Sequence, residues 1–351
     1  MRFPKFIEDN AVIGFPAPSF GCADEPYASA FKEALRKFTA MGYTVKPGPN
    51  SDKALGIGIS NKPELCGREF MDMYTDPSID ALISCGGGEL MCEILDHVDF
   101  KKLSEADPKW LMGYSDNTNL IFLLSTLADT AGIYGPCAPA FGMEPWHEAV
   151  RDAFDLLRGK KLTQNGYPLY EIESKKDETH PLEPYNVTEK RMISAFIPKE
   201  GGLTKTAAGS LSFEGRLIGG CLDCLVNLAG TCFDKVNDFA DRYKDDGLIW
   251  FLEACDLNVF SIRRAVWELK HAGWFDHVKG FLIGRPLQGE TMFNLDRFHA
   301  VTDILESFNV PVLMDLDIGH LPPMMPLIVG ASTGVTFDPA EDKLEIKQAL
   351  R

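Results

Sequence analysis

The chain has 351 residues, 45% of them hydrophobic, and a formal net charge of −16. The length favours two domains, and the negative charge argues against nucleic acids and anionic membranes as partners, because both would repel it. No leader-like segment opens the chain and no apolar run reaches the length of a membrane span, so we expect a cytoplasmic protein. The nine cysteines are scattered and odd in number, which favours reduced thiols over a disulfide framework.

Short apolar runs alternate with helix-like segments through the first part of the chain. We expect strands over residues 11–15, 43–45 and 79–84, and helices over 27–41 and 68–74. The first helix closes on Gly42, since glycine commonly follows a helix end. Strands that alternate with helices predict a parallel sheet with helices on both faces.

Three glycines, Gly86 to Gly88, follow the strand expected over 79–84. Each glycine costs backbone entropy on folding, so the run needs a physical reason. One interpretation is a tight turn between strand and helix. The other is a backbone that approaches a ligand closely and offers it N–H groups. The run matches neither the dinucleotide fingerprint nor a phosphate-binding loop, so a nucleotide site is weakly indicated.

A buried strand expected over 110–113 is followed by a turn that contains Ser115 and Asp116. The apolar segment 120–127 then predicts a helix. A serine at such a turn holds its hydroxyl clear of the backbone, near helix N–H groups that stabilise an anion. On this stretch alone, a helix cap is the commoner role of a serine or aspartate in such a position. In a parallel sheet this turn and the Gly86–Gly88 turn lie at the same edge, so one can supply an oxyanion hole for the other.

Residues 163–198 are polar, charged and rich in proline, with no sustained period. We interpret this segment as the crossover between two domains and partly as a loop over the site. A plain solvated linker has the same charge pattern and is an equal alternative. The second domain is expected to begin near Gly201.

The second part of the chain contains further apolar runs, each of which ends in a turn. We expect strands over 215–221, 247–254, 278–285 and 310–314, and helices over 222–228 and 262–272. Cys221 and Cys224 have the Cys-x-x-Cys spacing of redox and zinc sites. No second such pair exists, and the spacing equally places two small apolar side chains on one helix face, which is the interpretation we favour.

Two polar residues, Glu253 and His320, follow apolar strands in this second part. A buried glutamate at a strand end needs a partner, although an exposed charge is the plainer alternative. Of the seven histidines, His320 is the one placed beside a glycine in a loop after a strand. Ser115, Glu253 and His320 therefore supply a nucleophile, a carboxylate and an imidazole, which are the parts of a serine-hydrolase triad.

Short motifs that run through nearly the whole chain match one family in the family's order. They are Ala11-Val12-Ile13, Gly87-Gly88, Leu95-Asp96-His97-Val98-Asp99-Phe100, Gly113-Tyr114-Ser115-Asp116, Gly135-Pro136, Leu217-Ile218-Gly219-Gly220, Leu252-Glu253 and Gly319-His320. Any one of them is weak, but together they are highly specific. On these motifs the chain resembles the LD-carboxypeptidase and microcin C immunity family of serine peptidases.

The resemblance implies an α/β fold, with an N-terminal Rossmann-like parallel-sheet domain and a C-terminal mixed β-rich α/β domain. We expect residues 1–160 to form the domain with the nucleophile, 161–200 the crossover, and 201–351 the domain with the glutamate and histidine. The resemblance also implies a homodimer that needs neither a metal nor an organic cofactor.

The family's roles carry over onto the matching residues of this chain. Ser115 would be the nucleophile, His320 the general base and acid, and Glu253 its orienting partner. The oxyanion hole would be formed by backbone N–H groups, those of Gly87, Gly88 and Asp116.

The activity implied is that of a serine carboxypeptidase acting on an amide next to a free carboxylate. An L,D bond of a murein tetrapeptide is the first substrate expected, and an aminoacyl- or peptidyl-nucleotide of the microcin kind is the alternative. Members that recycle peptidoglycan tend to have an arginine before the glycine pair, where this chain has Gly86. Immunity-type members carry tryptophans between the domains, whereas this chain has none between Trp146 and Trp250. A non-catalytic ligand-binding protein is the alternative from another class.

Overall fold

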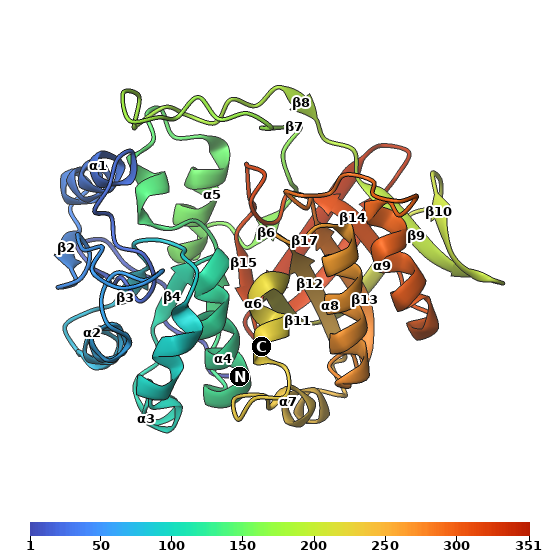
Figure 1. Ribbon diagram of the computed structural model, residues 1–351, viewed down its shortest axis with the longest axis horizontal. Coiled ribbons are helices and arrows are strands. Elements are labelled where there is room, and N and C mark those ends of the chain that lie inside the picture. The colour runs from blue at the N-terminus through green and yellow to red at the C-terminus, as the bar shows by residue number, and fades with distance from the viewer. The chain divides into compact units, whose positions relative to one another are not determined.

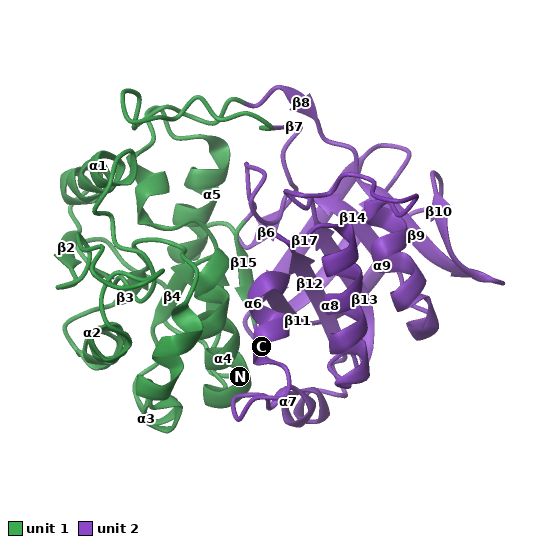
Figure 2. Cartoon of the chain, viewed as in Figure 1, with its two compact units in different colours: residues 1–161, 171–186, 326–329 green, residues 162–170, 187–325, 330–351 purple.

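The computed structural model describes residues 1–351, and the chain divides into two compact units (Figure 2). Unit 1 comprises residues 1–161, 171–186 and 326–329, and unit 2 comprises residues 162–170, 187–325 and 330–351. Each unit is built around its own large sheet (Figure 1). None of the helices has both the length and the apolar character needed to cross a bilayer.

The sheet of unit 1 has six strands in the order β15-β5-β4-β3-β1-β2. Their bounds are Val12–Phe15 (β1), Thr44–Pro47 (β2), Ala81–Ile83 (β3), Trp110–Gly113 (β4), Gly132–Tyr134 (β5) and Leu327–Val329 (β15). Strands β1 to β5 pair in parallel, which confirms the expected parallel sheet. Strand β15 comes from near the end of the chain and pairs with β5 in the antiparallel sense, a connection that the sequence did not indicate.

The helices of unit 1 follow from their apolar spacing. They are Tyr27–Ala40 (α1), Pro63–Thr75 (α2), Phe100–Glu105 (α3), Thr118–Ala128 (α4) and Glu148–Leu157 (α5), with short 3₁₀ helices at Met91–His97, Ser115–Asn117 and Ala138–Gly142. Helix α1 buries Ala30, Ala34 and Phe38, which lie four residues apart on one face. Helix α4 is buried on nearly every side, as expected of a helix that is apolar all round.

The sheet of unit 2 has nine strands in the order β10-β9-β14-β13-β12-β11-β16-β17-β6. Their bounds are Thr163–Gln164 (β6), Ser194–Lys199 (β9), Gly202–Thr206 (β10), Leu211–Cys221 (β11), Leu248–Glu253 (β12), Val278–Gly284 (β13), Val312–Leu316 (β14), Ser332–Asp338 (β16) and Lys343–Ala349 (β17). Strands β11 to β14 pair in parallel and the flanking strands pair antiparallel, which confirms the expected mixed sheet.

The remaining elements of unit 2 connect these strands. Its helices are Leu222–Leu228 (α6), Val236–Arg242 (α7), Val259–His271 (α8) and Arg297–Leu305 (α9), with a 3₁₀ helix at Glu306–Phe308. Helix α8 begins at Val259 because the side chain of Asn258 accepts hydrogen bonds from the N–H groups of Phe260 and Ser261. Strand β12 is buried along its whole length, as a central strand of a parallel layer should be.

The segment 163–198 is less irregular than its composition indicated. Besides β6 and the start of β9 it contains Leu169–Tyr170 (β7) and Glu189–Lys190 (β8), which form a separate two-stranded ladder. Strand β9 pairs with β14 inside the large sheet, so the sheet of unit 2 begins before Gly201. Strands β6, β7 and β8 have two residues each, which is too short to show the alternation of apolar and polar residues that marks a strand in a sequence.

Candidate active site

Ser115 lies in a sharp turn between a strand and a helix. Strand β4 ends at Gly113, and Ser115 opens the short 3₁₀ helix that leads into α4. The backbone of Ser115 has φ of 61°, a left-handed conformation that is uncommon for a residue other than glycine. Such strain costs about 1–3 kcal/mol and persists where the surroundings hold it in place. The N–H of Ser115 donates a hydrogen bond of 3.2 Å to the hydroxyl of Tyr134 in β5. The expected strand, turn and helix are thus present, in the geometry that presents a serine hydroxyl.

The side chain of Asp116 holds this turn from within. It is 3% exposed and accepts hydrogen bonds from the Ser19 hydroxyl at 2.5 Å and from the Met91 N–H at 2.9 Å. The Asn119 side-chain amide donates a third, of 3.0 Å. Asp116 therefore ties the turn after β4 to the loop after β1 and to the segment after β3. Sequence reasoning considered Asp116 as a helix cap and as a backbone donor to an oxyanion, and gave no sign of these contacts with distant segments.

Asn117 connects the serine turn to the glycine turn. Its side-chain amide donates hydrogen bonds to the carbonyl oxygens of Gly86, at 2.8 Å, and Tyr114, at 3.0 Å. Sequence reasoning assigned this asparagine no role. The asparagine binds the backbone of the neighbouring turn, which a glycine would be unable to do.

The glycine turn approaches Ser115 closely. A methyl group on Gly87 would lie 3.0 Å from Cβ and 3.1 Å from Oγ of Ser115. The N–H groups of Gly87 and Gly88 donate none of the hydrogen bonds within the protein, whereas the carbonyl of Gly87 accepts one from Phe20. Unused N–H donors in a turn that lies against a serine side chain are the parts from which an oxyanion hole is built.

Glu253 and His320 meet in unit 2. Nδ1 of His320 and Oε2 of Glu253 are 2.9 Å apart, and Glu253 is 2% exposed, so the carboxylate at the end of β12 is not the solvated charge considered above. The residue before His320 must be small: Gly319 has φ of 106°, and a Cβ on it would lie 2.4 Å from Oε2 of Glu253. Burial disfavours a charge on the ring, but the negative charge of Glu253 and the hydrogen bonds that the ring donates to Cys255 and Glu253 outweigh it and raise the pKa of His320 above its ordinary value.

Two cysteines complete the surroundings of this pair. The thiol of Cys255 hydrogen-bonds the imidazole of His320, and Cys221 lies beside Glu253 in the register of β11 and β12. Sulfur of Cys221, a carboxylate oxygen of Glu253 and a ring nitrogen of His320 lie within 4.8 Å of one another, the one group of this kind able to hold a metal ion. Sequence reasoning missed Cys255, although its position two residues after Glu253 was a signal.

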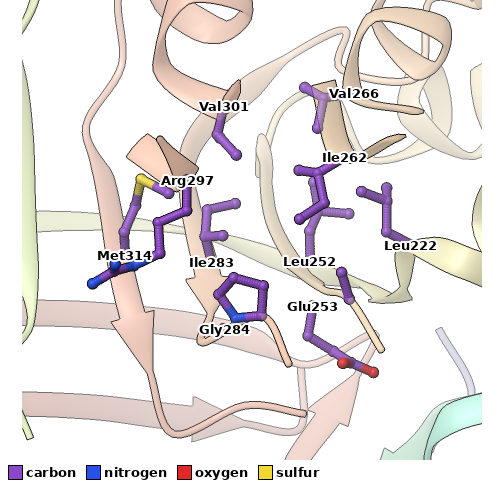
Figure 3. Close-up of a pocket in the computed structure, with 12 residues that line it drawn as sticks. Leu222, Leu252, Glu253, Ile262, Val266, Ile283, Gly284, Arg297, Val301 and Met314 are labelled. Carbon is purple, nitrogen blue, oxygen red and sulfur yellow. The ribbon is translucent and has the colours of Figure 1, made fainter. Parts of the chain in front are cut away.

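A small apolar cavity adjoins Glu253. It has a volume of about 20 Å³ and is lined largely by side chains of β12, β13, α8 and α9. This is room for about one water molecule, and too little for a substrate. Figure 3 shows the Glu253 carboxylate pointing away from the apolar side chains of Ile262 and Val266. The cavity is therefore a packing space behind the glutamate.

The predicted site residues fall into two groups. Ser115, Asp116, Gly87 and Gly88 belong to unit 1, where the structure brings Ser115 next to the glycine turn. Glu253 and His320 belong to unit 2, where the structure joins them by a hydrogen bond. Within each unit, the residues that sequence reasoning selected lie at the ends of parallel strands.

Comparison with known protein families covers the two regions of the chain that contain these groups. The family model described as the LD-carboxypeptidase N-terminal domain matches residues 13–135, and the one described as the LD-carboxypeptidase C-terminal domain matches residues 214–335. Together the two matches cover more than half of the chain. The chain belongs to the LD-carboxypeptidase family.

Relatives in this family have two kinds of name. The microcin C7 self-immunity protein MccF of Escherichia coli is 27% identical over 275 residues, which are 77% of this chain and 75% of that protein. A protein of Vibrio cholerae named "Putative carboxypeptidase" is 25% identical over an alignment of 358 positions, which covers 98% of this chain and 98% of that protein. The LD-carboxypeptidase family and these names support a hydrolase.

Solved structures share the fold. A crystal structure of an MccF-like protein from Bacillus anthracis has a TM-score of 0.80 at 20% identity, covering 99% of this chain and 100% of that one. A structure of MccF in complex with aspartyl sulfamoyl adenosine has a TM-score of 0.77 at 21% identity, with 99% and 98% covered. The two-domain α/β architecture is thus that of the LD-carboxypeptidase family.

Proposed function

We propose that this protein is a serine carboxypeptidase that hydrolyses an amide next to a free carboxylate, and that its substrate bond is the L,D bond of a murein tetrapeptide. The observation that carries the proposal is the 2.9 Å hydrogen bond between the buried Glu253 and Nδ1 of His320. A buried carboxylate in this position fixes the tautomer of the ring and leaves Nε2 to act on a serine hydroxyl. Membership of the LD-carboxypeptidase family supports the same chemistry.

The reaction would proceed in two halves. In the first, Oγ of Ser115 attacks the carbonyl carbon while Nε2 of His320 takes the hydroxyl proton. The C–N bond then breaks, the amine leaves with that proton, and the acyl group remains on Ser115. In the second, His320 takes a proton from water, the resulting hydroxide attacks the ester, and Ser115 recovers its proton. Glu253 stabilises the imidazolium in both halves, which agrees with the raised pKa of His320.

The negative oxygen formed in each half needs hydrogen-bond donors. We assign this role to the N–H groups of Gly87, Gly88 and Asp116. The two glycine donors have no acceptor within the protein, and Gly87 lies against Ser115. Loss of one such donor commonly lowers kcat by about 10²–10³-fold.

The choice of a peptide substrate rests on the segment 163–198. Three of its four aromatic rings contact side chains of their own unit, namely Tyr170, Tyr185 and Phe196, and the fourth, Tyr167, is buried. The ring of Tyr170 lies 4.3 Å from the guanidinium of Arg285, and that of Tyr185 lies 5.4 Å from the ring of His147. Stacking of a base on an aromatic ring contributes roughly 1–3 kcal/mol in nucleic-acid binders, so rings already in contact favour peptides over nucleotides.

The second candidate is hydrolysis of an aminoacyl- or peptidyl-nucleotide. It is favoured by the similarity to MccF, whose structures include complexes with aspartyl sulfamoyl adenosine and glutamyl sulfamoyl guanosine. Both candidates use the same chemistry, because each substrate carries an acyl group on nitrogen.

One experiment separates the candidates. Murein tetrapeptides and aminoacyl-sulfamoyl nucleotides are assayed for hydrolysis with the wild type and with Ser115→Ala. We expect a higher kcat/KM for the tetrapeptide and a fall of about 10⁴-fold or more in Ser115→Ala. Turnover of Ser115→Ala within about tenfold of the wild type would exclude Ser115 as the nucleophile. A clear preference for the nucleotide conjugates would select the second candidate.

A serine-directed acylating probe tests the non-catalytic alternative. An enzyme of this type should be labelled at Ser115, as seen by mass spectrometry of the peptide, and the Ser115→Ala variant should not be labelled. A wild-type protein that binds a murein peptide but takes up no label would be a ligand-binding protein.

We further infer that the protein acts in the cytoplasm as a homodimer. None of the nine cysteines is in a disulfide, which suits a reducing compartment. Light scattering coupled to size-exclusion chromatography measures the molar mass in solution, and a monomer at working concentration would contradict the dimer.

A further inference from the structure

Two thiol groups, those of Cys221 and Cys255, lie beside the Glu253–His320 pair, although a serine-hydrolase mechanism needs no thiol there. Sulfur of Cys221 lies within 4.8 Å of both a Glu253 oxygen and a His320 nitrogen, and the Cys255 thiol hydrogen-bonds the imidazole. Sulfur, imidazole nitrogen and carboxylate oxygen are the three kinds of ligand that zinc prefers in proteins. None of the steps proposed for hydrolysis uses either cysteine.

The backbone holds these side chains together. Cys221 and Glu253 are register partners at the ends of the neighbouring parallel strands β11 and β12. The carboxylate of Asp223 accepts the N–H groups of Cys255, at 3.0 Å, and Asp256, at 2.8 Å, and it accepts a hydrogen bond of 3.4 Å from the Cys221 thiol. Asp223 thus fixes the loop after β12 against the start of α6. Outer groups that orient ligands in this way are typical of metal sites.

We propose that Cys221, Cys255, Glu253 and His320 bind one soft divalent cation of the zinc class, and that this cation inhibits the enzyme. In a tetrahedral zinc site the ligand atoms are about 3 to 4 Å apart. The 4.8 Å span of the Cys221, Glu253 and His320 atoms therefore needs to contract by only a small side-chain movement. Binding forms bonds from the cation to two sulfurs, one oxygen and one ring nitrogen. The two thiol protons, and any proton on the ligating nitrogen, leave to solvent.

Inhibition follows from the loss of the base. A cation on the imidazole occupies a nitrogen lone pair or separates His320 from Glu253, and in either case His320 no longer accepts the serine proton in the correct tautomer. The inhibition should be reversible, because a chelator removes the cation without covalent change. This inference goes beyond the proposed function, since metal binding is measured without turnover.

The first test uses Co²⁺ as a spectroscopic substitute for zinc, with a phosphine reductant present to keep the thiols reduced. We expect one equivalent of Co²⁺ to bind the full-length protein and to produce the sulfur-to-cobalt absorption of a thiolate site. The Ser115→Ala variant should bind equally well, which separates this result from the fate of the proposed hydrolase. A spectrum without sulfur-to-cobalt absorption would overturn the proposal.

Cysteine variants locate the site. Cys221→Ser and Cys255→Ser should each weaken Co²⁺ binding by about tenfold or more, because removal of a ligand costs at least as much as removal of an orienting group. The matched control is Cys232→Ser, since Cys232 is exposed and outside the cluster. Circular dichroism confirms that each variant is folded, and the use of two ligand variants covers the case in which one is not. Equal affinity in all three variants would show that the thiols are packing residues only.

The inhibition is tested with Zn²⁺ on the hydrolysis that the wild type shows. The Zn²⁺ concentration that gives half-inhibition should be about tenfold or more higher in Cys255→Ser than in Cys232→Ser. The rate of each variant is expressed relative to its own metal-free rate. A chelator should restore the activity. Zinc that binds at the cobalt site without lowering the rate would overturn the inhibitory role.

Discussion

His320 is subject to two opposing influences, and their balance gives a prediction about pH. Burial disfavours the imidazolium, whereas the Glu253 carboxylate favours it and raises the pKa of the ring. A general base acts in its neutral form, so with a chelator present kcat/KM should rise with pH as the ring loses its proton. Glu253→Gln removes the negative charge and lowers the pKa of His320. The acid limb of the profile should therefore move to lower pH, while kcat falls by up to about 10⁴-fold.

The control for this variant is Glu345→Gln, which changes an exposed glutamate of β17 in the same unit. It should leave both the position of the acid limb and kcat unchanged. An acid limb that stays in place in Glu253→Gln would show that another group titrates there.

Gly87 gives a second prediction at the scale of a single residue. A methyl group at this position meets Ser115 at 3.0 Å from Cβ and 3.1 Å from Oγ, so either the serine or the turn must shift. We expect Gly87→Ala to lower kcat by about 10²-fold, because shifts near the reacting atoms misplace both the nucleophile and the donors. Gly334→Ala is the matched control, since a methyl group there meets no atom within 4 Å. Equal kcat in the two variants would contradict a catalytic role for the glycine turn.

Among the elements of unit 1, the loops after β1, β3 and β4 are joined through one carboxylate. One carboxylate oxygen of Asp116 accepts hydrogen bonds from Ser19 and Met91, and the other accepts one from Asn119. An asparagine in its place would turn its NH₂ group toward one or other of these donors, whichever way the side-chain amide is oriented. Asp116→Asn should therefore lower the free energy of unfolding by about 1–3 kcal/mol and also lower kcat. Denaturant unfolding and steady-state kinetics measure the two effects. Asp96→Asn, at an exposed position of the same unit, should change neither.

The sequence could predict those elements whose residues carry their own signal. The apolar runs that become β1, β3, β4, β12, β13 and β14 are continuous. Glycines after β3 and polar residues at the ends of β4, β12 and β14 mark the candidate site. Gly87 and Gly319 were informative because a side chain at either position would press against a proposed catalytic residue, Ser115 in one case and Glu253 in the other. Helix α6 begins at Leu222, where the sequence predicted the start of a helix after the glycine turn.

Other elements depend on partners far along the chain. Strands β6 to β8 are two residues each and owe their existence to pairing. The hydrogen bonds of Asp116 to Ser19 and of Cys255 to His320 join residues whose proximity is a product of the fold. A single sequence offers no pattern for such contacts, because their spacing follows neither a helix nor a strand.

At the scale of the whole molecule, the two compact units group residues that contact one another, whereas the expected domains are continuous ranges of the sequence. The ranges 1–160, 161–200 and 201–351 remain a prediction about how the chain divides under a protease. Limited proteolysis should cut first within 161–200, where short ladders and turns prevail. First cleavage inside either large sheet would contradict these ranges.

Strand β15 gives the last prediction, because it places residues 327–329 in unit 1. Ile328 is fully buried there, and Ile328→Ala should cost about 2–5 kcal/mol. Hydrogen exchange should quicken first in Gly132–Tyr134, the partner strand, although it lies far away in sequence. Ile346→Ala removes an equally buried isoleucine from β17, and its effect should begin in unit 2. Unchanged exchange in β5 of Ile328→Ala would contradict the prediction.

The return of the chain to β5 also constrains how the protein is made. A ribosome releases the first five strands of this sheet early, but the sixth follows only after the whole central part of unit 2 has been synthesised. Until then β5 presents an unpaired edge, to which other nascent chains can add. Translation that stops after residue 320 but before residue 327 would leave that edge exposed permanently. We therefore expect such truncated products to be captured by chaperones or to aggregate, even though every residue proposed for catalysis has already been made.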